Sequence, residues 1–264
     1  MREVTIEESR KIQLDILIHF DKWCNQHKLH YSIGEGTLIG AVRHQGFIPW
    51  DDDIDLLMPR YDFDKFVELY DGEYRLISLR TEKRWWSCYV RLTDERTIVN
   101  FNNPKHNFHG LWISILPIDN YPDDQNKWIV AQKKLNVYFT IGKIKDSYWT
   151  ENTSFVKNLT KYLLKSFFLP VSYNFIGRKC QRILNSFSDK ESKRKGLLAC
   201  LWLGYWVYDA SVFSNYTEVE FEGRRFSAWE NYDAYLRGQY GDYMQLPPEE
   251  KRLPLHNYKA FWKN

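Results

Sequence analysis

Hydrophobic residues near the N-terminus recur at helical spacing, and shorter apolar runs follow them. Over residues 5–27 the apolar side chains fall on one face, which predicts an amphipathic helix. Thr5 and Glu8 stand three residues apart at its start, a spacing typical of a capping box. The next elements expected are a strand, a turn and a helix, over 31–33, 34–36 and 38–42.

The rest of the chain predicts short strands separated by helices. A strand over 53–58 precedes a helix whose apolar face lies within 63–70. Later strands are expected over 74–79, 86–92, 111–116 and 217–226, the last with a turn at Glu222-Gly223. A final helix over 231–240 precedes a double-proline loop at 247–248.

The segment from about residue 123 to 195 is mainly helical in pattern and strongly basic. Between Lys127 and Lys195 it holds 12 Lys and 3 Arg against 2 Asp and 2 Glu, so the remainder of the chain is acidic. Apolar residues over 155–168 form a broad helical face within it. No repeat, low-complexity tract or flexible linker interrupts the chain. We therefore expect one α+β domain over 1–264, with a basic helical subdomain inserted at about 123–195.

Composition narrows the surroundings and partners of the protein. Hydrophobic residues make up 44% of the 264, and no apolar run is long enough to span a bilayer. The N-terminus lacks the apolar stretch of a secretory signal. The four scattered cysteines argue against disulfides or structural zinc and favour a reducing, cytoplasmic compartment. The basic middle suits an anionic surface, membrane phospholipid or nucleic acid, although solvated helix faces explain it equally well.

Four aspartates and one isoleucine make up the segment 51–55. In a strand Asp53 and Asp55 share a face, and Asp51 joins them if the chain stays extended. Carboxylates held side by side repel one another, so a cation such as Mg²⁺ is their natural partner. Apolar flanks argue against a surface acidic turn, and an EF-hand loop fails because Leu56 stands where glycine is required. A metal-dependent glycosyltransferase, which shares the Asp-x-Asp pattern, remains an alternative.

A candidate phosphate site precedes the acidic segment. Gly36 and Thr37 lie where a strand turns into a helix, so free backbone N–H groups and the positive end of the helix dipole point outward. Such a turn can hold a phosphate and the Thr37 hydroxyl can donate to it, although most Gly-Thr turns are simple caps. The Asp-x-Asp pattern follows about seventeen residues later. This succession predicts a metal-dependent phosphotransferase.

The twenty residues from Gly36 to Asp55 resemble the signature of the LicD family. They read Gly-Thr-Leu-Ile-Gly-Ala-Val-Arg-His-Gln-Gly-Phe-Ile-Pro-Trp-Asp-Asp-Asp-Ile-Asp, with Gly, Arg, Pro, Trp and Asp in the places that the family pattern requires. The likeness continues through Met58-Pro59-Arg60 and, near the C-terminus, through 221–223, 240–244 and 246–252. It therefore covers both ends of the chain, and the basic middle carries the least of it.

The resemblance implies a nucleotidyltransferase fold similar to that of DNA polymerase β, with a mixed-sheet core. It implies transfer of phosphocholine from CDP-choline, or of a polyol phosphate from CDP-glycerol or CDP-ribitol, with release of CMP. The acceptor would be a sugar hydroxyl of a teichoic acid, lipopolysaccharide or capsule precursor. Asp53 and Asp55, with Asp51, would bind Mg²⁺ or Mn²⁺, and Gly36-Thr37 would contact the diphosphate.

The basic amphipathic middle gains a meaning from this function. It would hold the enzyme at the inner face of the cell membrane, where lipid-linked acceptors are found, and no nucleic acid would bind. One position departs from the family pattern, because Ser114 stands where a third carboxylate is expected from a neighbouring strand. Asp119, Asp52 and Glu35 are the candidates to replace it, and we place Asp119 among the catalytic residues. A non-catalytic role in envelope assembly stays open on the same ground.

Several cations and tryptophans are further candidates for contact with the donor. The cations are Arg43, Arg60, Arg91, Lys251 and Arg252. Arg43 equally suits the end of a helix, and for Arg60 and Arg91 a surface ion pair is the more common role. The double-proline loop is followed by Lys251, Arg252 and His256, which would close over the nucleotide. The tryptophans, which would cage a choline ammonium or fill the core, are Trp85, Trp86, Trp112, Trp202, Trp206 and Trp229.

Overall fold

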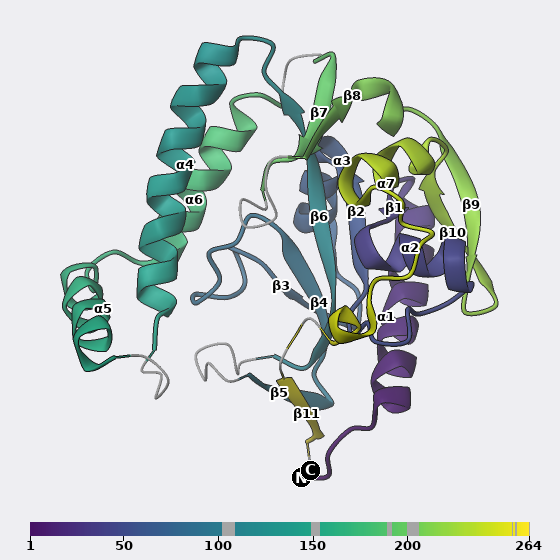
Figure 1. The fold of residues 1–264 in the computed structure, drawn as a ribbon, viewed down its shortest axis with the longest axis horizontal. Coiled ribbons are helices and arrows are strands. Elements are labelled where there is room, and N and C mark those ends of the chain that lie inside the picture. The colour runs from purple at the N-terminus through teal and green to yellow at the C-terminus, as the bar shows by residue number, and fades with distance from the viewer. Residues whose placement is uncertain are drawn as a thin grey trace.

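A mixed β-sheet with helices around it makes up the body of the protein (Figure 1). The computed structural model describes residues 1–101, 109–148, 154–188, 192–199, 206–254, 256 and 258–263. The helices are α1 (Ile6–His27), α2 (Glu35–His44), α3 (Arg60–Leu69), α4 (Gln125–Asp146), α5 (Phe155–Phe167), α6 (Tyr173–Asn185), α7 (Tyr232–Tyr240) and the 3₁₀ turns η2 (Ala210–Phe213) and η3 (Glu249–Lys251). The strands are β1 (Ser32–Ile33), β2 (Asp55–Pro59), β3 (Arg75–Ile77), β4 (Val90–Asp94), β5 (Thr97–Phe101), β6 (Leu111–Tyr121), β7 (Arg194–Leu197), β8 (Trp206–Asp209), β9 (Tyr216–Phe221), β10 (Arg224–Trp229) and β11 (Tyr258–Trp262).

The central sheet has the strand order β1-β2-β6-β4-β3, with β7 added to the far end of β6 and β8 to β7. β2 and β6 run parallel, and the other pairs in this sheet are antiparallel. Hairpin β9–β10 and the pair β5–β11 complete the strands. The α+β class expected from the sequence is confirmed.

Helix α1 shows why the first apolar pattern forms a helix. Thr5 Oγ1 accepts a hydrogen bond from the Glu8 N–H at 3.2 Å, and Glu8 Oε2 accepts one from the Thr5 N–H at 3.0 Å. This capping box satisfies two amides that the helix itself leaves free. Ile16 and Phe20 are fully buried where α1 packs on β4 and β6. Each such side chain contributes about 2 kcal/mol by leaving water.

Strand β6 is longer than the sequence pattern predicted, because it continues through Pro117. The N–H of Ser114 points to β2, where it donates to Ile54 O, so three residues later the nitrogen of Pro117 points to the opposite side. On that side β4 pairs only as far as Ile115, and β7 begins to pair at Asp119. The missing N–H of proline therefore breaks no strand pair.

Several other boundaries moved relative to the sequence expectation. Helix α2 starts at Glu35, so the turn expected at 34–36 is its first turn. Strand β4 occupies Val90–Asp94, later than the expected 86–92. Hairpin β9–β10 turns at Glu222 and Gly223 as predicted, with φ of 51° and 69°, which suits the type I′ turns of two-residue hairpins.

The segment predicted to be helical and basic forms α4, α5 and α6 before β7 begins at Arg194. Helices α4 and α6 pack on each other beside the end of β6 and share a small apolar cluster of their own, which includes Leu135, Phe139 and Cys180. Figure 1 shows α5 beyond one end of α4, apart from the sheet. Within the described residues, no helix combines the length and the apolar character needed to cross a bilayer.

Candidate active site

Asp51, Asp53 and Asp55 line one cavity of about 560 Å³ together with Gly36. The cavity lies where the first turn of α2, the loop before β2 and the segment after α7 meet. Asp53 is buried, and Asp51 and Asp55 are half-buried. The structure thus brings together the acidic segment and the first residue of the Gly-Thr turn.

Strand β2 begins at Asp55 and not at Asp53, where the sequence placed its start. The chain is nevertheless already extended at Ile54, whose carbonyl oxygen accepts the Ser114 N–H at 2.8 Å. Ile54 is fully buried, while its two aspartate neighbours line the cavity on the other side of the strand. The alternation that puts both aspartates on one face is therefore preserved.

Burial dominates the electrostatics of the three carboxyl groups. It raises the pKa of Asp51 to about 7, and the charges of Asp53 and Asp52 add to this effect. Burial also raises the pKa of Asp53 and, joined by the charges of Asp53, Glu35 and Asp51, that of Asp55. A cation among these oxygens would remove the cost of ionising them. The donor set therefore fits a hard divalent cation such as Mg²⁺.

Asp52 points to a different partner, His256, which follows η3. His256 Nδ1 lies 3.0 Å from Asp52 Oδ1 and 3.7 Å from Asp53 Oδ2, and the His256 N–H donates to Asp52 Oδ2 at 3.1 Å. Ligand atoms of these three residues all lie within 4.8 Å of one another. Burial opposes the charged imidazole, but the Asp52 hydrogen bond and the Asp53 charge outweigh it and raise the pKa of His256. Asp53 thus has both this histidine and the aspartate cavity beside it.

Gly36 lets a carboxylate approach the first turn of α2. A Cβ atom on Gly36 would lie 2.5 Å from Asp51 Oδ2, closer than real contacts allow. Thr37 is buried, and its Oγ1 accepts a 2.9 Å hydrogen bond from the Asp55 N–H. The Gly-Thr pair therefore positions two of the three aspartates, a role that the sequence did not reveal.

The close approach at Gly36 gives a testable result. Gly36→Ala is expected to displace the Asp51 carboxylate and to lower turnover by roughly 10- to 100-fold, because small misplacements of reacting groups cost that much. The fold should persist, since alanine is favoured over glycine inside a helix. Steady-state rates and thermal unfolding check both points. Wild-type turnover in this variant would contradict the positioning role.

Glu35 is the acidic residue that connects α2 to α7. It is buried, lines the cavity and accepts hydrogen bonds from the hydroxyls of Tyr235 at 2.6 Å and Tyr240 at 2.5 Å, and from the Gln239 amide. Burial raises the pKa of Glu35, against the effect of these three hydrogen bonds. The Glu35 carboxylate thus holds α7 against the cavity. It acts on the aspartates through its charge, which raises the pKa of Asp55.

Two of the predicted cations hold the segment that covers the cavity. Arg43 Nη1 donates to the carbonyl oxygens of Tyr243 at 2.6 Å and Gln245 at 3.3 Å. Arg252 Nε donates to Pro247 O at 2.8 Å, and its guanidinium lies 5.6 Å from the ring centre of Trp50. Lys251 is exposed in η3 beside it. These contacts show how the rim of the cavity is built.

Comparison with known proteins decides the family. Residues 28–179 match the family described as LicD/FKTN/FKRP, nucleotidyltransferase domain. The chain is 30% identical over 279 residues to the lipopolysaccharide cholinephosphotransferase LicD of Haemophilus influenzae, with 99% of each chain covered. This chain belongs to the LicD family. An uncharacterized protein of Rickettsia typhi is 35% identical over 101 residues (38% of this chain, 30% of its own), and one of Rickettsia prowazekii is 58% identical over 31 residues, 12% of each chain.

In this LicD-family protein, Ser114 occupies the strand position directly beside the acidic segment. Ser114 pairs with Asp55 of β2 on one side and with Arg91 of β4 on the other. Residues paired in this way point to the same face of a sheet, so the three form a row. The Arg91 charge lowers the pKa of both Asp53 and Asp55, against the larger effect of burial. The cation Arg91 on β4 thus lies directly beside Ser114 on β6, the position where the family pattern has an acid.

Asp119 does not reach the cavity. It lies five residues beyond Ser114 on β6, roughly 17 Å along an extended strand, and its Oδ1 accepts a 2.7 Å hydrogen bond from Arg60 Nε. Both side chains are buried, with at most 5% exposed. Arg60 and Asp119 form an ion pair with each other away from the three aspartates, so neither is carried into the proposed site.

The tryptophans named from the sequence lie elsewhere, as far as the structure describes them. None of the described ones lines the aspartate cavity, and Trp202 falls outside the described residues. The cavity instead presents Trp50, Tyr240 and Tyr243. All three stand in the runs that resemble the LicD family, but no local signal placed them on one wall, because two of them come from the far end of the chain.

Residues of α1 that the sequence did not single out support the acidic segment from behind. Arg10 Nη2 donates to the carbonyl oxygens of Ile48 at 3.1 Å and Pro49 at 2.8 Å. Gln13 Nε2 donates to Asp52 O at 2.9 Å. The loop before β2 is therefore held by residues of α1 that precede it by some forty positions. Polar residues on a helix carry no sequence signal for such a contact.

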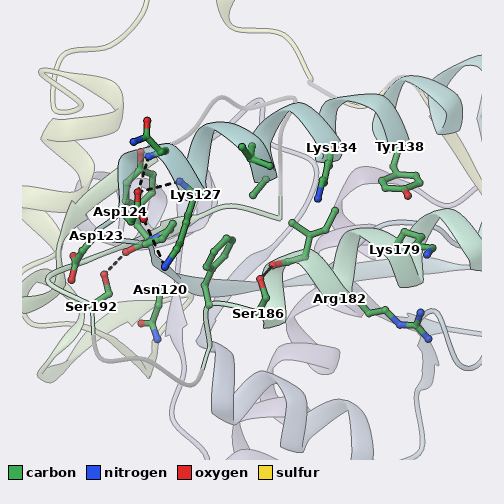
Figure 2. A pocket seen from close by; sticks show the side chains of 17 residues that line it. Asn120, Asp123, Asp124, Lys127, Lys134, Tyr138, Lys179, Arg182, Ser186 and Ser192 are labelled. Carbon is green, nitrogen blue, oxygen red and sulfur yellow. Dashed lines mark hydrogen bonds and ion pairs between the residues drawn. The ribbon is translucent and has the colours of Figure 1, made fainter.

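A larger cavity of about 1060 Å³ lies between α4 and α6 (Figure 2). Lys134 and Lys179 reach its walls from the two helices, and Val130 and Ile183 add apolar surface. Its lining includes Asn120, six residues beyond Ser114 and roughly 20 Å farther along β6. None of the three aspartates lines it, so the larger of the two cavities is not the one that holds the acidic segment.

Proposed function

We propose that the protein transfers phosphocholine from CDP-choline to a sugar hydroxyl of an envelope glycan precursor and releases CMP. The observation that carries this proposal is the cavity in which Asp51, Asp53 and Asp55 face the start of α2. The full-length similarity to a lipopolysaccharide cholinephosphotransferase supports the choice of phosphocholine. We infer further that the sheet around β2 and β6 is the core of a nucleotidyltransferase fold, as the description of the family suggests.

Asp53 and Asp55, with Asp51, would hold the metal ion, Mg²⁺ or Mn²⁺. When bound, it would neutralise charge on the diphosphate and on the departing CMP. Arg91 lies in the same row of side chains as Asp55 and would add positive charge on the side where Ser114 replaces an acid. Because Asp119 lies elsewhere, a carboxylate of the cluster would accept the proton of the acceptor hydroxyl.

The first turn of α2 would bind the phosphate of the donor. Gly34, its N-cap, has no side chain with which to cap the first amides of the helix. These amides and the helix dipole favour an anion at Gly36, which lines the cavity. Trp50, Tyr240 and Tyr243 on the cavity wall would receive the choline ammonium by cation–π attraction.

Binding of a cation to the aspartates should change how the free energy of unfolding depends on pH. Asp51 has a pKa of about 7 in the folded chain, against roughly 3.9 for an unfolded aspartate, so the folded state binds its proton more tightly. The free energy of unfolding should therefore fall as pH rises from about 4 to about 7 when EDTA is present. Saturating Mg²⁺ should flatten this decline, because the cation replaces the proton. Thermal unfolding curves that coincide with EDTA and with Mg²⁺ at every pH would contradict a metal at this cluster.

A panel of donors tests the proposed reaction. The protein is incubated with Mg²⁺, a glycan acceptor and either CDP-choline, CDP-glycerol, CDP-ribitol or a UDP- or GDP-sugar, and the released nucleotide is measured. We expect CMP, with CDP-choline as the best donor. Release of UDP or GDP would indicate the glycosyltransferase alternative. No release of CMP from any CDP donor across several acceptors would overturn the proposal.

We infer a cytoplasmic place of action, where a CDP-linked donor and a lipid-linked acceptor meet at the inner face of the membrane. The free thiols of Cys24, Cys88 and Cys180, all buried, suit a reducing compartment. The proposed substrates are a CDP-linked donor and a glycan acceptor, and we propose no nucleic acid as a partner.

A further inference from the structure

Helix α5 turns its apolar side chains to solvent, and the few residues that it packs against the rest of the protein are polar. Seven large apolar residues have 41–76% of their surface exposed: Phe155, Val156, Leu159, Tyr162, Leu163, Leu164 and Phe167. On the opposite stripe Asn158 is buried, and Lys161 and Lys165 are half-buried. A surface helix of a globular protein normally has the reverse arrangement. Exposed apolar patches of this kind mark contact surfaces.

Polar contacts hold α5 in this orientation. Lys165 Nζ donates to Ser147 O at 2.7 Å, directly after the end of α4. In return Lys145 Nζ of α4 donates to Phe168 O at 3.0 Å. These two bonds connect the C-terminal end of α5 to α4 through its polar side. The apolar face is thus left pointing outward by the attachment itself.

The charge around α5 points to an anionic partner. Residues 154–188, which include α5 and α6, contain six Lys and Arg residues and no Asp or Glu. A second copy of this surface would be repelled by the first, whereas anionic phospholipid head groups would be attracted. The 13 residues of α5 extend about 20 Å, too short to cross a bilayer but suited to lie along its surface.

We propose that α5 lies in the interface of an anionic phospholipid membrane, with its apolar face among the acyl chains and its lysines at the head groups. Its place beyond the end of α4 and apart from the sheet lets it reach a membrane before the rest of the body does (Figure 1). Lysine stems can extend along an apolar surface while their charged ends stay in water. The proposal stands independently of the reaction proposed above.

Vesicle flotation of the full-length protein tests this directly. We expect binding to phosphatidylcholine vesicles that contain phosphatidylglycerol, weaker binding to phosphatidylcholine alone, and weaker binding as salt rises. Leu163→Gln with Phe167→Gln should lower the partition coefficient by on the order of 100-fold, because two large apolar contacts are lost while helix propensity changes little. Circular dichroism and thermal unfolding verify that the variant is folded.

The matched control changes two large exposed apolar residues on α3. Tyr61 and Leu69 are 67% and 51% exposed, and Tyr61→Gln with Leu69→Gln should leave the partition coefficient unchanged. The proposal is overturned if wild-type protein does not float with anionic vesicles, or if both double variants bind equally. It is also overturned if the α5 variant instead abolishes a concentration-dependent dimer, which would identify a second copy as the occupant.

Discussion

Asp53→Asn is expected to lower the rate of CMP release from CDP-choline by on the order of a thousandfold, without lowering thermal stability. Asp53 is buried in a cluster in which neighbouring carboxylates raise one another's pKa. Asparagine removes one negative charge from that cluster, so the folded state should lose repulsion while the cation loses a ligand. Initial rates at saturating Mg²⁺, together with thermal unfolding of the metal-free protein, measure the two effects.

Asp242 provides the matched control for this prediction. It is exposed and lines the same cavity, but it is not among the groups that shift the pKa of the three aspartates. Asp242→Asn should therefore keep CMP release within about twofold of wild type, as expected for a surface acid that touches no catalytic group. Asp55→Asn should resemble Asp53→Asn. Wild-type rates in both Asp53→Asn and Asp55→Asn would show that the catalytic centre lies outside this cavity.

Asp119→Asn is expected to destabilise the protein by about 3 kcal/mol, because it removes the buried charge beside the Arg60 guanidinium and leaves Arg60 only the half-buried Asp64 as an ion-pair partner. At this chain length the melting temperature should fall by roughly 10 °C. Below the melting temperature of the variant, CMP release per folded molecule should stay close to wild type, since Asp119 lies far from the three aspartates along β6. Denaturant unfolding and steady-state rates separate the two quantities.

A double substitution distinguishes a structural pair from a catalytic acid. Arg60→Met with Asp119→Leu removes both charges and should recover much of the lost stability, because apolar side chains of similar size tolerate burial without a partner. Recovery of stability together with activity would fit the pair seen here. If Asp119→Asn unfolds like wild type but loses CMP release, Asp119 acts in catalysis after all.

The parts of this protein that the sequence predicted well are local. The capping box at Thr5 and Glu8 and the two-residue turn at Glu222-Gly223 depend on residues within a few positions of one another. The run from Gly36 to Asp55 is also local. It predicted the family, and it predicted that Gly36 and the aspartates lie together, as they do in one cavity. Such signals survive because short-range hydrogen bonds and strand alternation are fixed by neighbours in the chain.

The misplaced residues depended on contacts between distant segments. Asp119 was grouped with the aspartates because it follows Ser114 closely in sequence, but five strand positions carry it away and turn it to Arg60. The sequence expected His256 to close over the site, and its contact with Asp52, some two hundred residues away, was decided by the tertiary structure. Strand β6 continues through Pro117, where β4 no longer pairs with it. No periodicity reports which strand will stand beside another.

The sequence by itself predicted the candidate chemistry of this LicD-family protein: two carboxylates on one strand face, with Asp51 close to them, after a turn that can receive a phosphate. Only the tertiary structure decided which groups surround them. It placed Arg91 in line with Ser114 and Asp55, set Glu35 against α7, and left the apolar face of α5 outward. The reason is physical: alternation and capping act between near neighbours, whereas strand register and helix attachment depend on the packing of the whole chain.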